Sequence, residues 1–173
     1  SRSREVLVIA AVSLNSCLDR TLEVPGFAVG AHCQARLLGE RPAGKGMNLS
    51  RLLAARGADA RLYGFVGHDA ADRFAARLRE AGVENHLQAL PLRTRINTTL
   101  VDPEGGRETH IREHGEPVGA EAVDALRARL STELAAGDWV VFAGSLPPGI
   151  RPAAFADLVG QLADAGLAVA VDA

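Results

Sequence analysis

Residues 43–50 read Ala-Gly-Lys-Gly-Met-Asn-Leu-Ser and combine glycines with a cation where a helix is predicted to begin. Gly44 and Gly46 permit a ligand to approach the backbone closely, and the first N–H groups of a helix have no partner within the helix. Lys45 adds a positive charge. This combination suits a phosphate group or a polyhydroxylated sugar, although a glycine-rich turn that only leads into a helix has the same spacing.

Residues 39–45 also spell G-x-x-x-x-G-K, the beginning of a nucleotide-binding P-loop. The next residue is Gly46, where a P-loop needs Ser or Thr to hold magnesium, and residues 36–38 make a weak preceding strand. The sequence therefore does not favour a P-loop at this position.

Three more polar side chains lie beside predicted strands. Asp19 follows the apolar run of residues 6–14, at the edge where open α/β sheets bind ligands, and its carboxylate can accept two sugar hydroxyls. Arg95 offers a planar fork suited to phosphate. Ser145 follows the apolar run of residues 139–143, in a loop that two prolines stiffen. Taken singly, Asp19 also fits a solvated turn and Arg95 a surface position at a strand start.

Helical and strand-like segments alternate along much of the chain. Four stretches with helical spacing each end at a glycine placed as a helix C-cap, namely Gly57, Gly82, Gly137 and Gly166. Strand-like runs follow three of them, at residues 60–65, 139–143 and 167–171. This alternation is typical of βαβ units and predicts a parallel sheet with helices on its faces.

Other strand-like runs are joined without helices. They lie at residues 21–24, 35–38, 96–101 and 107–111, with Asp-Pro-Glu-Gly-Gly as a turn between the last two. We therefore expect a second, smaller antiparallel sheet within the same domain.

Composition narrows the class of partner. The 173 residues carry a net charge of −2 and no basic run, so we expect a small-molecule partner and no nucleic acid. Cys17 and Cys33 form no CxxC pair and residues 6–14 are too short to span a membrane, so we expect a cytoplasmic protein with no membrane segment. The histidines form no metal-binding pattern, and no G-x-S-x-G motif marks Ser145 as a nucleophile.

The two ends of the sequence also carry an expectation. The chain begins without Met and stops after a strand-like run that would need neighbours on both sides in a parallel sheet. We therefore expect a fragment, or a partial view, of a longer protein.

Four motifs together resemble the PfkB carbohydrate kinases in order and approximate spacing. They are residues 15–19, the Ala-Gly-Lys-Gly-x-Asn-x-Ser helix opening, Thr-Arg-x-Asn at 94–97, and Gly-Ser-Leu-Pro-Pro-Gly at 144–149. The likeness covers nearly the whole chain and is greatest to the phosphohexose branch, 1-phosphofructokinase and tagatose-6-phosphate kinase. It implies a ribokinase-like three-layer α/β/α fold with a mostly parallel sheet. Residues 1–173 would be its amino-terminal part, with small-sheet strands within 19–42 and 94–114 and the carboxyl-terminal half missing.

The resemblance also implies roles for particular residues. Sugar hydroxyls would bind to Asp19, Gly44 and Asn48, and the phosphate already on the substrate to Lys45, Arg95 and Ser145. The small sheet would be a lid over the sugar, and two lids could pair in a homodimer. The parent enzyme would use ATP with Mg²⁺ to phosphorylate fructose 1-phosphate, tagatose 6-phosphate or fructose 6-phosphate.

The chain departs from the family pattern at three places. The family usually has Pro where Ser16 stands, Gly-Gly at residues 43–44, and Asn-Glu-Pro-Gly where residues 112–115 read Arg-Glu-His-Gly. The last departure affects contacts near the phosphates.

No catalytic base is visible in the chain. The family's second half carries the nucleotide pocket and a Gly-Ala-Gly-Asp helix start whose Asp is the general base. Residues 136–138, Ala-Gly-Asp, resemble it superficially but predict a turn into a strand, so we expect the chain alone to be inactive. Two alternatives stay open: a ribokinase-like or nucleoside-kinase-like enzyme for an unphosphorylated substrate, and a non-catalytic sugar-binding module.

Overall fold

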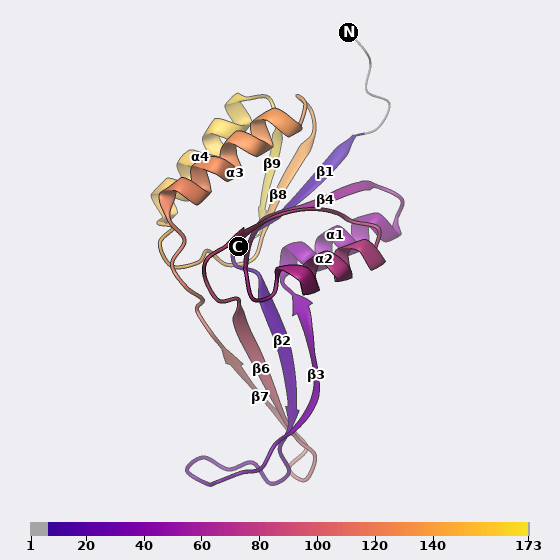
Figure 1. Ribbon diagram of the computed structural model, residues 1–173, viewed down its shortest axis with the longest axis vertical. Coiled ribbons are helices and arrows are strands. Elements are labelled where there is room, and N and C mark those ends of the chain that lie inside the picture. The colour runs from indigo at the N-terminus through magenta and orange to yellow at the C-terminus, as the bar shows by residue number, and fades with distance from the viewer. Residues whose placement is uncertain (1–6, 173) are drawn as a thin grey trace.

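A central sheet of five parallel strands organises the computed structural model, which describes residues 7–172 (Figure 1). β1 (Val8–Ser13) lies in the middle, between β4 (Asp59–Gly67) and β8 (Trp139–Ala143). β5 (Glu84–Leu90) and β9 (Ala168–Asp172) complete the order β5-β4-β1-β8-β9. The first residue of the predicted run 6–14, and the start of the chain where we expect no membrane segment, lie outside the described residues.

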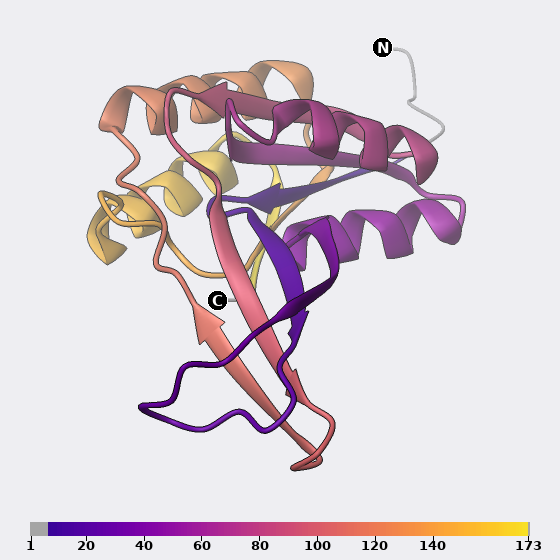
Figure 2. The ribbon, with the colours of Figure 1, turned by 60° about the horizontal axis from the view of Figure 1, so that its bottom comes forward.

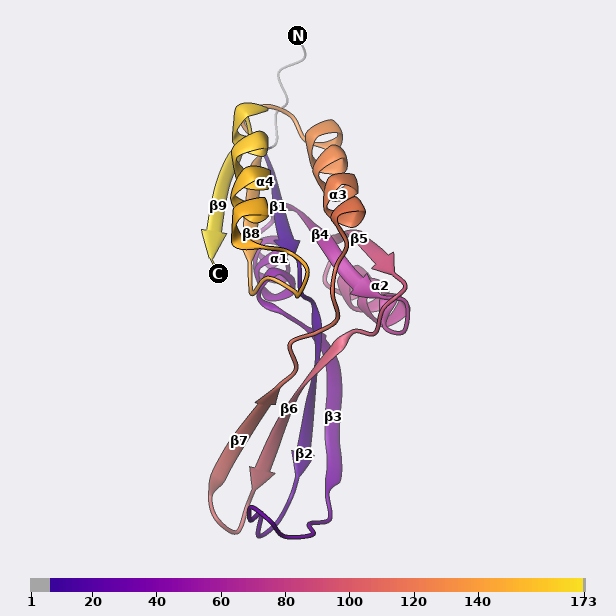
Figure 3. The same cartoon turned by 90° about the vertical axis from the view of Figure 1, so that its left-hand side faces the viewer.

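Helices cover both faces of this sheet (Figures 1 and 3). α1 (Lys45–Ala55) and α2 (Ala71–Glu80) bury Met47 and Phe74 against one face. α3 (Ala120–Glu133) and α4 (Pro152–Asp164) bury Leu126 and Leu162 against the other. Because the inner strands are covered on both faces, they read as continuous apolar runs in the sequence. The predicted three-layer α/β/α arrangement is confirmed.

A second sheet projects from the carboxyl ends of the central strands (Figures 2 and 3). It consists of β3 (Arg36–Ala43), β2 (Cys17–Glu23), β6 (Arg95–Asp102) and β7 (Arg107–Arg112), in the order β3-β2-β6-β7. Its outer pairs are antiparallel as expected, but the central pair β2–β6 is parallel. The reason is that β2 follows β1 and β6 follows β5, so both strands leave the same edge of the parallel sheet in the same direction.

Two segments differ in detail from the sequence analysis. β5 is not among the predicted strands, because an edge strand with the sequence Glu-Asn-His-Leu-Gln-Ala-Leu has no apolar run to identify it. β8 begins at the predicted residue, but Trp139 is 42% exposed and so does not belong to the buried core.

The turn predicted at residues 136–138 is confirmed. The buried carboxylate of Asp138 accepts hydrogen bonds from the backbone N–H groups of Val8 (3.0 Å) and Ala135 (2.8 Å). Asp138 therefore fastens the start of β8 to the start of β1. Within residues 7–172, no helix combines the length and the apolar character that a membrane crossing requires.

Candidate functional site

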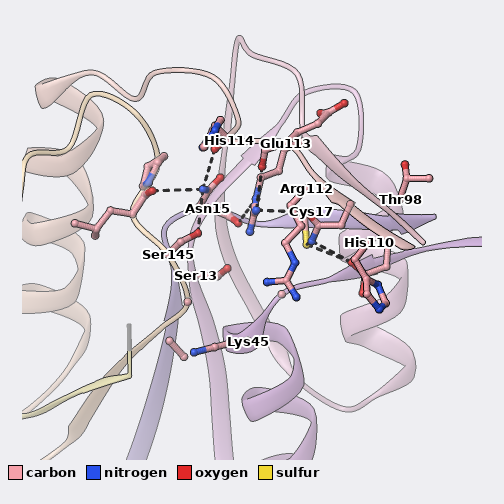
Figure 4. Close-up of a pocket in the computed structure, with 18 of the residues that line it drawn as sticks. Ser13, Asn15, Cys17, Lys45, Thr98, His110, Arg112, Glu113, His114 and Ser145 are labelled. Atoms are coloured by element: carbon pink, nitrogen blue, oxygen red, sulfur yellow. Dashed lines mark hydrogen bonds between the residues drawn. The ribbon is translucent and has the colours of Figure 1, made fainter. Parts of the chain in front are cut away.

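One cavity, of about 1030 Å³, lies where the small sheet meets the carboxyl ends of β1 and β8 and the start of α1. Its volume is at the upper end of the range for small-molecule sites. All the substrate-binding residues predicted from the sequence line it: Asp19, Gly44, Lys45, Asn48, Arg95 and Ser145. The structure thus brings together residues from distant parts of the chain (Figure 4), while their roles toward a ligand stay predictions.

The glycines at the start of α1 have separate structural reasons. Gly44 has a φ of 128°, a backbone conformation that residues with a side chain rarely adopt. A Cβ on Gly46 would lie 2.9 Å from Cβ of Ser13, so this glycine lets α1 pack directly against the end of β1. Both glycines therefore fix the first turn of α1 at the cavity wall.

Lys45 has an ion-pair partner, but a weak one. Its Nζ lies 3.4 Å from the carboxylate of Asp172 at the end of β9, and the two side chains are 56% and 70% exposed. Exposed pairs of this length contribute little stability. The ammonium group therefore stays available to an anion in the cavity.

Asn15 organises the loop that carries Ser145 (Figure 4). Its Nδ2 donates hydrogen bonds to Oγ of Ser145 (3.2 Å) and to the carbonyl oxygen of His114 (3.1 Å). Because the Ser145 hydroxyl accepts this bond, its own proton is free to be donated to a ligand. Gly115 has a φ of 91° and would place a Cβ 2.8 Å from Oδ1 of Asn15, so a glycine is required there.

Arg95 is engaged by the protein itself. Its Nε donates to the carbonyl oxygen of Asn15 (3.0 Å), and Nη1 donates to the carbonyl oxygen of Glu113 (3.2 Å) and to Oδ1 of Asn97 (3.5 Å). The guanidinium group predicted to bind phosphate therefore uses two of its three nitrogens to connect the segments that contain Asn15, Asn97 and Glu113. Only Nη2 has no protein acceptor within residues 7–172.

The Arg-Glu-His-Gly segment fixes the end of β7. The Glu113 carboxylate accepts hydrogen bonds from the backbone N–H of Ile96 (2.9 Å) and from Nη2 of Arg93 (2.8 Å). The bond from Ile96, with the Arg93 guanidinium, holds the pKa of Glu113 below its usual value. Glu113 thus acts as an ionised brace between β6 and the segment that follows β7.

The register of the small sheet aligns polar side chains in rows across the strands. Arg41 on β3 lies opposite Asp19 on β2, Asp19 opposite Asn97 on β6, and Asn97 opposite Arg112 on β7. All of them line the cavity. Two positions further along each strand, a second row that also lines the cavity consists of Thr21, Thr99 and His110. Because residues two apart on a strand share a face, these two rows form one polar face of the small sheet.

Most of this face carries no sequence motif. The motifs predict roles for Asp19 and Arg95 but give none to Arg41, Asn97 or Arg112. The signal that could have found part of it is alternation, because Cys17, Asp19 and Thr21 on β2 share one face.

Cys17 forms part of the cavity wall beside Asp19. Nδ2 of Asn97 lies 3.2 Å from Sγ of Cys17 and 3.3 Å from Oδ1 of Asp19, so one amide bridges the two side chains. Burial raises the pKa of the Cys17 thiol to about 11, against the opposing effect of the Arg95 charge. Cys17 is therefore a neutral thiol near pH 7, which makes it unsuited to act as a nucleophile.

The described part of the chain offers no metal centre. Within residues 7–172, no group of three His, Cys, Asp or Glu side chains could hold a metal ion.

Comparison with known proteins identifies close relatives. A family model described as pfkB family carbohydrate kinase matches residues 5–171. The 1-phosphofructokinase of Rhodobacter capsulatus is 38% identical over 167 residues, which cover 96% of this chain and 53% of that protein. The 1-phosphofructokinase of Escherichia coli (strain K12) is 31% identical over 154 residues, with coverages of 89% and 49%. The chain therefore spans about half the length of the curated relatives it matches.

Solved structures show the same fold. Phosphofructokinase-2 from Escherichia coli, in complex with fructose-6-phosphate, superimposes with a TM-score of 0.87 at 21% identity, covering 96% of this chain and 55% of that one. A possible 1-phosphofructokinase from Thermotoga maritima gives a TM-score of 0.77 at 26% identity, with coverages of 95% and 53%. The fold expected from the sequence is confirmed by these likenesses.

Proposed function

Because the chain belongs to the pfkB family of carbohydrate kinases, we propose that the protein containing it transfers the γ-phosphoryl group of ATP to a hydroxyl of a sugar phosphate. The observation that carries this proposal is the single cavity that unites the side chains predicted to bind hydroxyls and phosphate. The names of the relatives support fructose 1-phosphate as the first substrate to test. Fructose 6-phosphate and tagatose 6-phosphate are the next two.

Within the cavity, each group has a chemical role that suits its type. The Asp19 carboxylate accepts hydrogen bonds from sugar hydroxyls, and Asn48 on α1 can both donate and accept such bonds. Lys45 and Nη2 of Arg95 supply positive charge for the phosphate of the substrate, and the Ser145 hydroxyl donates to it. We propose that ATP, Mg²⁺ and the general base belong to the part of the protein outside this chain.

Positioning is the contribution that this chain makes to catalysis. Phosphoryl transfer depends mainly on holding the acceptor in line and on stabilising charge. The side chains on β2 and β6 hold the sugar, while the small sheet covers it as a lid and excludes water that would otherwise hydrolyse ATP. On this basis residues 1–173 alone bind the sugar but do not turn it over.

The test is a substrate profile of the whole protein, with release of ADP measured in the presence of ATP and Mg²⁺. The three sugar phosphates should be compared with fructose and ribose as unphosphorylated controls. Use of a sugar phosphate with little use of the free sugars supports the proposal. Preference for a free sugar or a nucleoside would instead assign a ribokinase-like activity, and binding without ADP release would assign a sugar-binding module.

We also propose that the protein forms a homodimer through the small sheet. Both edge strands of this sheet carry exposed large apolar side chains, since Leu37 and Leu38 on β3 are 59% and 47% exposed and Ile111 on β7 is 52% exposed. Sedimentation analysis should show a dimer that Leu37→Asp weakens. A protein that is monomeric at all concentrations would contradict this assembly.

A further inference from the structure

Arg112 is the last residue of β7 and stands at one end of the polar row Arg41–Asp19–Asn97–Arg112. Its side chain lines the same cavity as Lys45, from the start of α1, and Ser145, from the loop after β8 (Figure 4). All residues of β7 are exposed, so Arg112 can be reached from solvent as well as from the cavity that it lines.

The positive charge of Arg112 is not neutralised by its surroundings. Within residues 7–172 the guanidinium makes no hydrogen bond or ion pair, and the residue opposite it in the row is the neutral Asn97. The adjacent carboxylate of Glu113 is engaged by Arg93 and by the backbone of Ile96. Arg112 can therefore give its whole fork of donors to a ligand.

The other two arginines of this wall are in different situations. Arg95 gives Nε and Nη1 to protein acceptors. Arg41 lies directly opposite the carboxylate of Asp19, and opposite charges at cross-strand positions attract one another. Of the three guanidinium groups, that of Arg112 is the one with neither a protein acceptor nor an opposing carboxylate in its row.

We propose that Arg112 binds the phosphate group of the sugar substrate from the side of the small sheet, and so makes the cavity select phosphorylated over free sugars. This inference rests on the proposed function and assigns a specificity-determining residue to it. The family resemblance places Asn at this position, so the extra cation is a property of this chain.

The geometry of the row suits such a substrate. Two strand spacings separate Arg112 from Asp19, or roughly 10 Å between their Cα atoms. The long Arg112 side chain can reach back over Asn97 and shorten this gap. A sugar phosphate can therefore place hydroxyls at Asp19 and Asn97. Arg112 can then make two parallel hydrogen bonds to the same phosphate that Lys45 and Ser145 contact.

The experiment compares three variants of the whole protein, Arg112→Gln, Arg112→Lys and the matched control Arg36→Gln. Arg36 is also on the small sheet, pairs with Glu23 at 2.9 Å and does not line the cavity. The KM for fructose 1-phosphate should rise roughly 10- to 100-fold in Arg112→Gln, as expected for loss of a charged hydrogen bond. Arg112→Lys should recover part of this loss, because it keeps the charge but not the fork, and Arg36→Gln should match the unchanged protein.

Thermal unfolding separates this inference from the proposed function. Fructose 1-phosphate should raise the Tm of the unchanged protein more than fructose does, and Arg112→Gln should reduce this difference while Arg36→Gln leaves it unchanged. If no sugar phosphate is turned over but this difference is present and depends on Arg112, the kinase proposal fails while the role of Arg112 stands. If Arg112→Gln behaves like Arg36→Gln in both KM and Tm, Arg112 is only a solvated residue and the inference is wrong.

Discussion

Replacing Arg95 by Lys should reduce stability even in the absence of substrate. The guanidinium donates to the carbonyl oxygens of Asn15 at 3.0 Å and of Glu113 at 3.2 Å. Hydrogen bonds from a charged donor contribute about 1.5–3 kcal/mol each, and a lysine in this position can retain at most one of the two. The free energy of unfolding should therefore fall by about 1.5–3 kcal/mol, although the charge of the side chain is unchanged.

The same substitution should loosen the cavity. Asn15 holds the hydroxyl of Ser145, and the carbonyl oxygen of Glu113 lies beside the end of β7. Without the hydrogen bonds from Arg95, Asn15 and the segment after β7 are held less firmly at the cavity. The KM for the sugar phosphate should therefore rise as stability falls.

Urea unfolding followed by circular dichroism, with no ligand present, measures the effect. Arg36→Lys is the control, because the Arg36 side chain is 70% exposed and its ion pair with Glu23 should change stability by no more than about 0.5 kcal/mol. If Arg95→Lys is as stable as Arg36→Lys, then the hydrogen bonds from Arg95 to Asn15 and Glu113 do not stabilise the fold, and the role of Arg95 is limited to the ligand.

Two further predictions concern the frame of the site. Gly64→Ala should destabilise by about 2–5 kcal/mol, because its φ is 122° and a Cβ would lie 1.9 Å from a carbonyl oxygen of β1. Gly57→Ala, at a φ of 80° with open space around it, should lose only about 1–2 kcal/mol in the same unfolding assay, and equal losses would contradict the reasoning. Hydrogen bonds from the backbone N–H of Gly105, and then from Arg107, lower the pKa of Asp102. Asp102 therefore stabilises the fold above its ordinary pKa of about 3.9, and this contribution is lost as the pH falls through the lowered value. Asp102→Asn should accordingly be the less stable protein at pH 7, with a gap that narrows below about pH 4; a gap independent of pH would refute this.

The parts of the fold that the sequence predicts are those with local causes. A helix that ends at a glycine, as α1 does at Gly57, can be recognised from a few neighbouring residues. A strand buried on both faces, such as β8, can be recognised from its run of apolar residues. β5 leaves no such pattern, because its sequence has no apolar run, whereas β9 at the other edge of the sheet has one. The parallel pairing of β2 with β6 is also invisible locally, since it follows from the edge at which two separate strands leave the central sheet.

The candidate site divides in the same way. Gly44 and Lys45 lie at the start of α1 and Ser145 in the loop after β8, where nearby glycines and prolines restrict the backbone conformation, and all three line the cavity. Arg112 begins the Arg-Glu-His-Gly segment that departs from the family pattern, but the segment itself gives Arg112 no role. Arg112 is part of the site because the register of two strand pairs, β2–β6 and β6–β7, aligns it with Asp19, and that register is set by tertiary pairing.

Arg95 and Arg112 together show why residue type alone does not reveal a ligand-binding cation. A guanidinium group has five N–H donors, and each donor that holds a backbone carbonyl is unavailable to a phosphate unless the structural bond breaks. Arg95 uses its donors to close the cavity, so a phosphate that drew them away would weaken the wall that confines it. A second cation without structural duties removes this conflict, and Arg112 at the end of the same wall meets that requirement. Binding energy from Arg112 can then go to selecting the phosphorylated substrate, while Arg95 keeps the site in shape.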